Sequence, residues 1–455
     1  MDEIVGLAPS GSLGSGYNVE SFNRALDANP DFIGQDAGST DMGPTHLGDG
    51  VLFFPESSYR HDLSLMLNAA REREIPLLVG SCITAGTRGQ LGQAVAMVKD
   101  LAREAGHSFK MAVIDAELDK DYLKKRLADG AFQSLGPEGE LTPADIDRSS
   151  HIVAQMGVEP FIRALEAGAD VIIAGRACDD VIFAALPVMK GFDKGLSLHM
   201  GKILECAGLS ASPIDLQEPL IGRIRDDHFV VEPGNADLRC TTVSVASHSL
   251  YERTDPCIQP GPGGVNDLSE TVFEQLDERS VKVSGSRFIS DSVYKVKLEG
   301  AEVIGYRSIV MSGIRDAIMI SQIDDILEEA RERVRLRFGA VDDGEYHLDF
   351  HIYGKNAVMR MLEPETDHVP LEIGLLINVV AKTQDLANAV AMHARGTLGH
   401  TSYPGIITTA GNLAFPFSPF NVPVGPACRF SLYHLMPLDD PCECFPMEMI
   451  TVGGA

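Results

Sequence analysis

The sequence lacks two features, and each absence argues against a class of protein. No apolar run approaches the roughly 18 residues that a membrane-spanning helix needs, so we expect no membrane segment. Basic residues are not in excess, because 38 Lys and Arg stand against 65 Asp and Glu, which gives a net charge of −27. Nucleic acids and anionic membranes bind clustered cations, so neither is expected as a partner. Residues 1–4 carry no basic segment, so no signal peptide is predicted.

The usual spacings of metal and nucleotide motifs are also missing. The eight cysteines include no CxxC pair, which favours reduced thiols in a cytoplasmic protein. The histidines form no HExxH pattern, so a zinc site lacks support, and we assign no metal ligands. A GxxxxGK[ST] loop is absent as well, which argues against a P-loop ATPase.

What is present is an alternation of short apolar runs and helical stretches over residues 1–220. This pattern predicts an α/β domain with a mostly parallel sheet and helices on both faces. Residues 221–300 are richer in Thr, Val, Ser, Gly and Pro, which predicts a β-rich connecting section with strands near residues 240–246 and 292–298. Residues 301–455 show the order β-α-β-β-α-β, which predicts a smaller α+β section of the ferredoxin-like (split βαβ) type.

In a parallel sheet, ligands bind beyond the carboxyl ends of the strands, so we expect the active site in the loops that follow them. The first of these loops contains three serines and three glycines, whose backbone N–H groups could bind a phosphate or carboxylate or could form only a tight turn. Its expected substrate-binding residues are Ser10, Gly11, Ser12, Gly14, Ser15 and Gly16. The corresponding residues of the second and third loops are Ser39, Ser81, Thr84, Ala85, Thr87 and Arg88.

The first loop also leaves a nucleotide site open as an alternative. A GxGxxG motif that begins at Gly14 would need a third glycine where the sequence has Val19. Asp36 nevertheless lies 20 residues after Gly16, where a ribose-binding acid would be found.

Two acids of the second loop, Asp36 and Asp41, are candidates for acid–base catalysis, because two carboxyls in one pocket push their pKa values apart. The alternative is an Asx turn or a helix N-cap. With Asp180, their hard oxygen ligands could also hold Mg²⁺.

The stretch from residue 175 to 180 is the most specific local signal. Arg176 would emerge from a strand end as a fork for a carboxylate or phosphate. Of Asp179 and Asp180, one would cap the next helix and the other would orient Arg176. Cys178 could be a nucleophile, although a buried inert thiol is more common.

A predicted helix over residues 199–206 places His199, Lys202 and Glu205 on adjacent turns. Glu205 could act as a general base facing a pocket, and the alternative is an exposed charge pair with Lys202. His248, with Glu252 and Asp255, is predicted to lie in a loop that covers the site or packs.

These segments resemble the acyclic terpene utilisation (AtuA) family. The resemblance rests on residues 161–179, 201–206, 247–256, 285–288 and 312–316 and on the N-terminal Gly/Ser loop, and it covers about residues 3–320. Tyr17-Asn18-Val19 replaces the aromatic-rich sequence of typical members, which indicates a divergent branch. The resemblance implies catabolism of branched acids, as CoA thioesters in the namesake case, and an association with a short companion protein.

We therefore predict a cytoplasmic lyase of the hydratase/dehydratase type, acting on a small branched carboxylic acid or its CoA thioester. The anion would bind the first and third loops, Arg176 and Lys202, and Asp36, Asp41 or Glu205 would move the proton. Asp180 is a further catalytic candidate. No cofactor is required, with Mg²⁺ or a nucleotide as alternatives. A homo-oligomer is expected, and the remaining alternatives are a nucleotide-dependent enzyme and a non-catalytic subunit that needs the companion protein.

Overall fold

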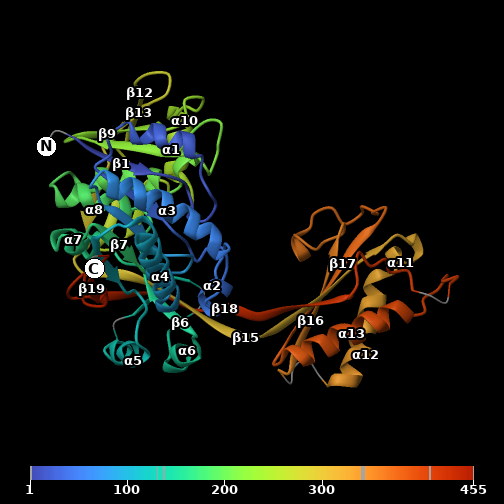
Figure 1. Cartoon of the computed structure of the whole chain (residues 1–455). Coiled ribbons are helices and arrows are strands. Elements are labelled where there is room, and N and C mark those ends of the chain that lie inside the picture. Colours follow the sequence, from blue (N-terminus) through green and yellow to red (C-terminus); the bar gives the residue numbers. More distant parts are fainter. Residues whose placement is uncertain (1–2, 131, 137–138, 340–343, 409–410, 454–455) are drawn as a thin grey trace. The chain divides into compact units, whose positions relative to one another are not determined.

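The computed structural model describes residues 3–130, 132–136, 139–339, 344–408 and 411–453 (Figure 1). The chain forms two compact units. Unit 1 comprises Met1–Glu302 and Phe430–Ala455, and unit 2 comprises Val303–Arg429. Residues 221–300 thus lie within unit 1.

Unit 1 is built on a ten-stranded sheet that is parallel only in its centre. The central strands, in spatial order, are β1 (Ile4–Ala8), β2 (Phe32–Asp36), β3 (Leu77–Gly80), β7 (Val171–Ala174) and β4 (Phe109–Ile114). Antiparallel strands flank this centre: β8 (Leu220–Ile224), β9 (His228–Pro233), β13 (Val281–Ser284) and β12 (Val272–Gln275) on one side, and β19 (Met447–Val452) on the other. The parallel pairing predicted for residues 1–220 is confirmed for the five central strands. The sheet as a whole is only partly parallel, because turns such as residues 225–227 are too short for a parallel crossover.

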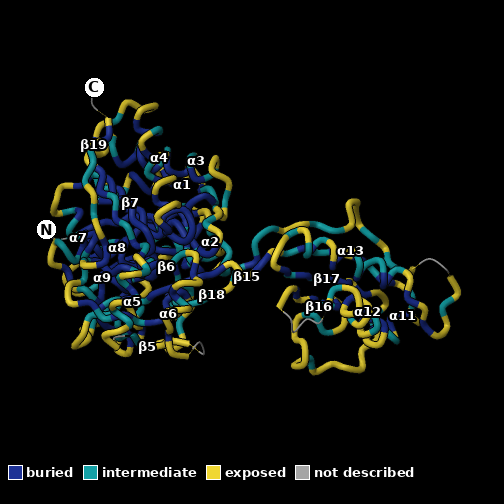
Figure 2. Tube along the Cα trace, turned by 90° about the horizontal axis from the view of Figure 1, so that it is seen from below, coloured by how far each residue is buried: buried dark blue, intermediate teal, exposed yellow. Residues whose placement is uncertain are grey.

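Helices cover both faces of this sheet, as predicted. Neighbouring residues of one strand point to opposite faces, so Val171 packs in one core cluster and Ile172 in the other. One face carries α1 (Val19–Leu26), α3 (Glu56–Glu72) and α4 (Arg88–Ala105). The other carries α7 (Val158–Glu166), α8 (Val181–Met189) and α9 (Lys194–Leu204). The strand β7 and most of α8 are buried (Figure 2).

Shorter elements complete unit 1. The helical ones are α2 (Thr45–Gly48), α5 (Lys120–Ala128), α6 (Pro143–Arg148), α10 (Thr242–Leu250) and the 3-10 helix η1 (Ala207–Ser210). A three-stranded antiparallel sheet contains β10 (Ile258–Gly261), β11 (Gly264–Asp267) and β14 (Arg287–Ser290). The first part of β15 (Tyr294–Ile314) pairs with β6 (His151–Ala154), and the last part of β18 (Asn421–Leu438) pairs with β5 (Gln133–Ser134).

The helix α10 replaces the strand expected near residues 240–246. The Val, Ser and Thr residues there alternate as in a strand, but local hydrogen bonds favour a helix start. The Thr241 hydroxyl accepts from the Ser244 N–H, and the Ser244 hydroxyl accepts from the Thr241 N–H, which forms a capping box. His248 consequently lies in a helix and is buried, so its predicted position in a loop is wrong.

Unit 2 follows the predicted order of helices and strands. The second part of β15 is followed by α11 (Ala317–Ser321), α12 (Ile323–Phe338), β16 (Tyr346–Tyr353), the 3-10 helix η3 (Arg360–Leu362), β17 (Ile373–Ala381), α13 (Gln384–His400) and the first part of β18. Strands β16, β17 and β15 form antiparallel ladders in that order. Residues such as Val334, Val379 and Val390 pack the helices on this sheet. The finer assignment to the ferredoxin-like type stays a prediction.

No helix in the described part of the chain is long and apolar enough to cross a membrane.

Candidate functional site

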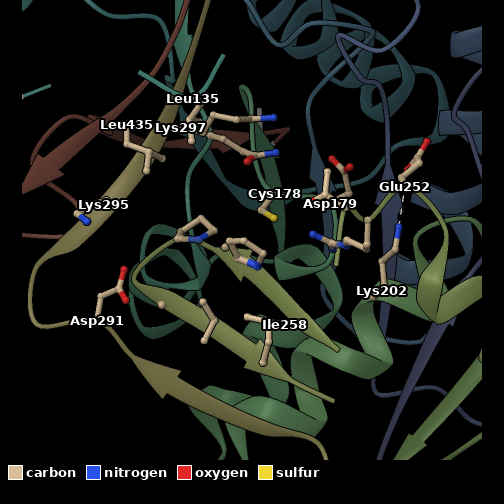
Figure 3. Close-up of a pocket in the computed structure, with 18 of the residues that line it drawn as sticks. Leu135, Cys178, Asp179, Lys202, Glu252, Ile258, Asp291, Lys295, Lys297 and Leu435 are labelled. Carbon is tan, nitrogen blue, oxygen red and sulfur yellow. Dashed lines mark ion pairs between the residues drawn. The ribbon is translucent and has the colours of Figure 1, made fainter. Parts of the chain in front are cut away.

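Unit 1 contains a cavity of about 700 Å³ at the carboxyl end of β7 (Figure 3). This is the edge at which the sheet rule places a ligand. Its apolar wall includes Leu135, Ile258, Pro260, Pro262, Val265 and Leu435. Its ionisable side chains are Asp41, Arg176, Cys178, Asp179, Lys202, Glu205, Glu252, Arg253, Asp291, Lys295, Lys297 and Tyr433.

Arg176, directly after β7, is the most constrained charge of the cavity. Its side chain is 2% exposed, and its Nε lies 2.8 Å from Glu299 Oε2. Its Nη1 donates to Asp179 Oδ1 at 3.1 Å and to Ser81 Oγ at 3.0 Å. The prediction that a neighbouring Asp orients Arg176 is therefore confirmed for Asp179, while a role in binding an external anion stays a prediction.

Glu299, on β15, is the acceptor at the centre of this network. Besides Arg176, it receives Lys297 Nζ at 2.8 Å and Thr40 Oγ1 at 3.0 Å. Burial alone would raise the pKa of Glu299, but the charges of Arg176 and Lys297 and their hydrogen bonds lower it to about 2. Glu299 is thus an ionised, fully buried anchor.

Lys202 and Glu205 form a buried ion pair on α9, as their spacing predicts. Lys202 Nζ also lies 3.7 Å from Glu252 Oε2. Burial raises the pKa of Glu205 to about 8; Lys202 opposes this rise and the charge of Asp179 adds to it. The two side chains are only 3% and 5% exposed, so the alternative of an exposed charge pair is wrong. Burial favours the protonated form of Glu205, and Lys202 favours its ionised form.

Asp36, at the end of β2, belongs to the same group of acids. Burial, and then the charge of Asp179, raise the pKa of Asp36 well above its usual range. Its Oδ1 has no hydrogen-bond partner among the described residues. Burial also raises the pKa of Asp179, against the pull of Arg176 and Lys202. Burial and mutual repulsion thus favour the protonated form at Asp36, Asp179 and Glu205, so the three carboxyls titrate as a coupled group.

Exposed acids form part of the cavity's border. Asp41, Glu252 and Asp291 line the cavity and are exposed, whereas Arg176 and Lys202 are buried. Figure 3 shows Asp291 near Lys295, across the cavity from Asp179, Lys202 and Glu252.

The first loop does not present its N–H groups to a ligand. Gly14 N and Gly16 N donate to Asp62 Oδ2 at 2.8 and 3.1 Å, so a carboxylate of α3 already occupies the predicted anion cradle. Asp62 is itself buried. The donors of the other loop residues also stay inside the protein: Gly11 N donates to Leu216 O, and the Ser10 and Ser15 hydroxyls donate to Ser12 O. The nucleotide alternative consequently loses its supporting observation.

The third loop contributes one predicted residue to the site. The Ser81 hydroxyl accepts from Arg176 and from the Ala177 N–H. The other predicted residues of this loop serve the fold. The Thr84 hydroxyl accepts from Phe53 N, Ala85 N donates to Gln90 Oε1, Thr87 caps α4, and Arg88 pairs with Asp115 at 2.6 Å.

Asp180 and Asp41 were expected to cap a helix or to form a turn, and only the turn at Asp41 is present. Asp180 is the N-cap residue of α8 but makes no side-chain cap bond, so its predicted capping role is wrong. The Ser39 hydroxyl accepts from Asp41 N at 3.0 Å, which holds the turn that carries Asp41.

Three residues that sequence reasoning missed, Lys295, Lys297 and Glu299, lie on one face of β15. Their alternation was the available signal, because every second residue of a strand points to the same side. Arg253, another missed residue, follows α10 and carried no such signal.

One set of potential metal ligands occurs among the described residues. Ligand atoms of Glu205, Cys206 and His248 lie within 4.8 Å of one another. However, Glu205 already binds the Lys202 ammonium, and burial raises the pKa of the Cys206 thiol. We therefore assign no metal there. Asp36, Asp41 and Asp180 form no such set in the described chain.

Comparison with known proteins gives one match. The model of the family described as "Acyclic terpene utilisation family protein AtuA" matches residues 56–420. The resemblance seen in the sequence is thereby confirmed, although the N-terminal Gly/Ser loop lies outside the matched residues. No curated protein and no solved structure gives a significant match.

We expect Asp62→Ala to lower the free energy of unfolding by about 3 kcal/mol, because one buried and one part-buried N–H group lose their acceptor. Asp62→Asn keeps one acceptor oxygen and should cost less. Differential scanning calorimetry would measure both, and an unchanged melting temperature in Asp62→Ala would contradict the internal role of this carboxylate.

We expect Arg176→Met to lower the free energy of unfolding by about 3–5 kcal/mol, because the Glu299 carboxylate loses its main partner while staying buried. The double variant Arg176→Met/Glu299→Leu should recover most of this loss. Arg287→Met, at an exposed arginine, is the matched control.

The same network predicts a pH dependence of stability. Ionised Glu299 stabilises the folded state fully above pH 4.5 and loses this contribution as the pH falls to about 2, because its pKa is lowered on folding. The melting temperatures of Arg176→Met and the wild type should therefore converge on acidification. A constant difference across this range would refute the assigned ion pair.

Proposed function

The chain belongs to the acyclic terpene utilisation (AtuA) family, and from this premise we propose that it is a hydratase/dehydratase acting on a branched carboxylic acid or its CoA thioester. Family membership supports a catabolic role. The reaction class and the substrate are proposals that rest on the chemistry of the cavity.

The observation that carries the proposal is the buried carboxyl of Glu205, which lines the cavity beside the buried Lys202. A carboxylic acid whose pKa is near 8 can deliver a proton at neutral pH and take it back in the reverse reaction. Lys202, bound to its Oε1, keeps the carboxyl oriented and stabilises its anion once the proton has left. Burial raises the pKa of Glu205, and the charge of Asp179 adds to this rise.

The wall of the cavity fits the proposed substrate class. Lys295 and Lys297 on β15 provide cations for a carboxylate or for the phosphates of a CoA thioester. Apolar side chains such as Ile258 and Val265 offer surface to a branched hydrocarbon chain.

The proposed reaction adds water across a double bond conjugated to the carboxyl or thioester carbonyl. A C–O bond forms at the β carbon, Glu205 protonates the α carbon, and one proton leaves the attacking water. Elimination runs through the same steps in reverse, with Glu205 accepting the α proton. Neither direction requires an oxidant or a reductant.

We also propose that the chain assembles, as a homo-oligomer or with a small companion protein. Light scattering on the purified chain, alone and with the companion, would test this. A monomer in both samples would contradict it.

We expect Glu205→Gln to reduce turnover at least about a hundredfold, because glutamine cannot deliver a proton. The assay follows the ultraviolet absorbance of conjugated branched acids, 3-methylcrotonate among them, and of their CoA thioesters. Glu166→Gln, an exposed acid at the end of α7, is the matched control and should leave turnover unchanged.

The wild-type rate of hydration should fall as the pH rises through about 8, because Glu205 then loses its proton. The stability of the folded protein should also depend on the ionisation of Glu205. The pKa of Glu205 is raised on folding, so wild-type stability should decline relative to Glu205→Gln between pH 4.5 and 8. A rate that is flat across pH 8 in an active enzyme would exclude Glu205 as the acid.

A further inference from the structure

A small side pocket of about 10 Å³ adjoins the main cavity. Arg253, Pro260, Gly261 and Pro262 line both spaces, so the two meet at these residues. A space of this size holds about one water molecule.

Three buried polar atoms that have no hydrogen-bond partner in the described part of the chain belong to residues that line this side pocket. They are Asp180 Oδ1, Asn266 Oδ1 and Arg253 Nε. Asp180 and Asn266 are only 9% and 6% exposed. Leaving one such atom unpaired costs about 1–3 kcal/mol, so three on residues that line one small space indicate a ligand that pairs with all of them.

The chemistry of the three atoms identifies this ligand. Two are acceptors and one is an N–H donor. The Asn266 amide is fixed in this sense, because its Nδ2 donates to Gly195 O at 3.2 Å and its oxygen is left for the pocket. A water molecule can donate to Asp180 and Asn266 and accept from Arg253, and these bonds leave one of its lone pairs free.

We infer that Asp180, Arg253 and Asn266 hold a single water molecule in the side pocket, and that this water is the reactant in the proposed hydration. The inference therefore rests on the proposed function. The free lone pair of the water attacks the β carbon, and Asp180 takes the proton released from it. The α carbon receives its proton from Glu205. One C–O bond, one C–H bond and the O–H bond on Asp180 form, while one O–H bond of water, the O–H bond of Glu205 and the C=C π bond break. Product release and exchange with solvent return both carboxyls to their starting states.

This assignment gives the donation and the acceptance of a proton to two acids on different helices. Glu205, at the end of α9, supplies the proton, and Asp180, at the start of α8, receives one. Arg253 keeps the water in place and compensates the negative charge of Asp180. Burial lowers the pKa of Arg253, and Asp180 is the acid whose charge raises it most.

The first test is a high-resolution crystal structure of the full chain, together with Asn266→Leu. We expect density for one water bonded to Asp180, Arg253 and Asn266 in the wild type, and its loss in the variant, where leucine fills the space. A dry pocket in the wild type would overturn the inference.

The second test separates the water site from the proposed function. Asn266→Leu should reduce kcat for hydration by about a hundredfold, while calorimetry with 3-methylglutarate, a saturated probe, should give an unchanged Kd. Asn266→Asp keeps the acceptor oxygen and should retain the water, and Asn356→Leu in unit 2 is the control for a remote asparagine. If the wild type hydrates its substrate and Asn266→Leu is equally fast, the inference fails although the proposed function stands. If the water is present but no branched acid or thioester is hydrated, the proposed function fails and the reactant role of the water fails with it.

Discussion

The buried ion pair between Arg176 and Glu299 is the interaction on which the site depends. Arg176 follows the central strand β7, and Glu299 lies on β15, 123 residues later in the chain. The pair therefore fixes β15 beside the carboxyl end of the sheet and presents Lys295 and Lys297 to the cavity. Its geometry has to be complete, because a buried charge that loses its partner is far more costly than one exposed to water.

A second constraint follows from crowding several carboxyls in the same place. Asp36, Asp179 and Glu205 come from three different elements, and burial prevents all of them from being ionised together. The protein thereby keeps at least one proton in the cavity at neutral pH, which solvent-exposed acids could not do. The same crowding explains why buried cations line a cavity in a strongly acidic chain.

The sequence predicted those parts of the site that depend on local pattern. Glu205 and Lys202 were found because helical spacing brings them together, and Asp36 and Arg176 because they follow strands. The anion cradle at Gly14 and Gly16 was mispredicted, since its occupant, Asp62, arrives from a helix some 46 residues away. The helix α10 was missed because its capping box outweighs an alternating pattern. Pairings between distant residues leave no local signal, so Glu299 could be assigned only in three dimensions.

The arrangement of exposed acids around buried cations has a kinetic consequence. An anionic ligand that approaches a chain of net charge −27 first meets repulsion, from the protein as a whole and from Asp41, Glu252 and Asp291. Of the attractive charges of the cavity, Arg176 and Lys202 are buried, and Lys295, near Asp291, is half-buried. Association is then slower than diffusion allows and is accelerated by added salt, which screens the outer charges more than the buried ones. Entry and exit become gated by charge, without any part of the chain having to move.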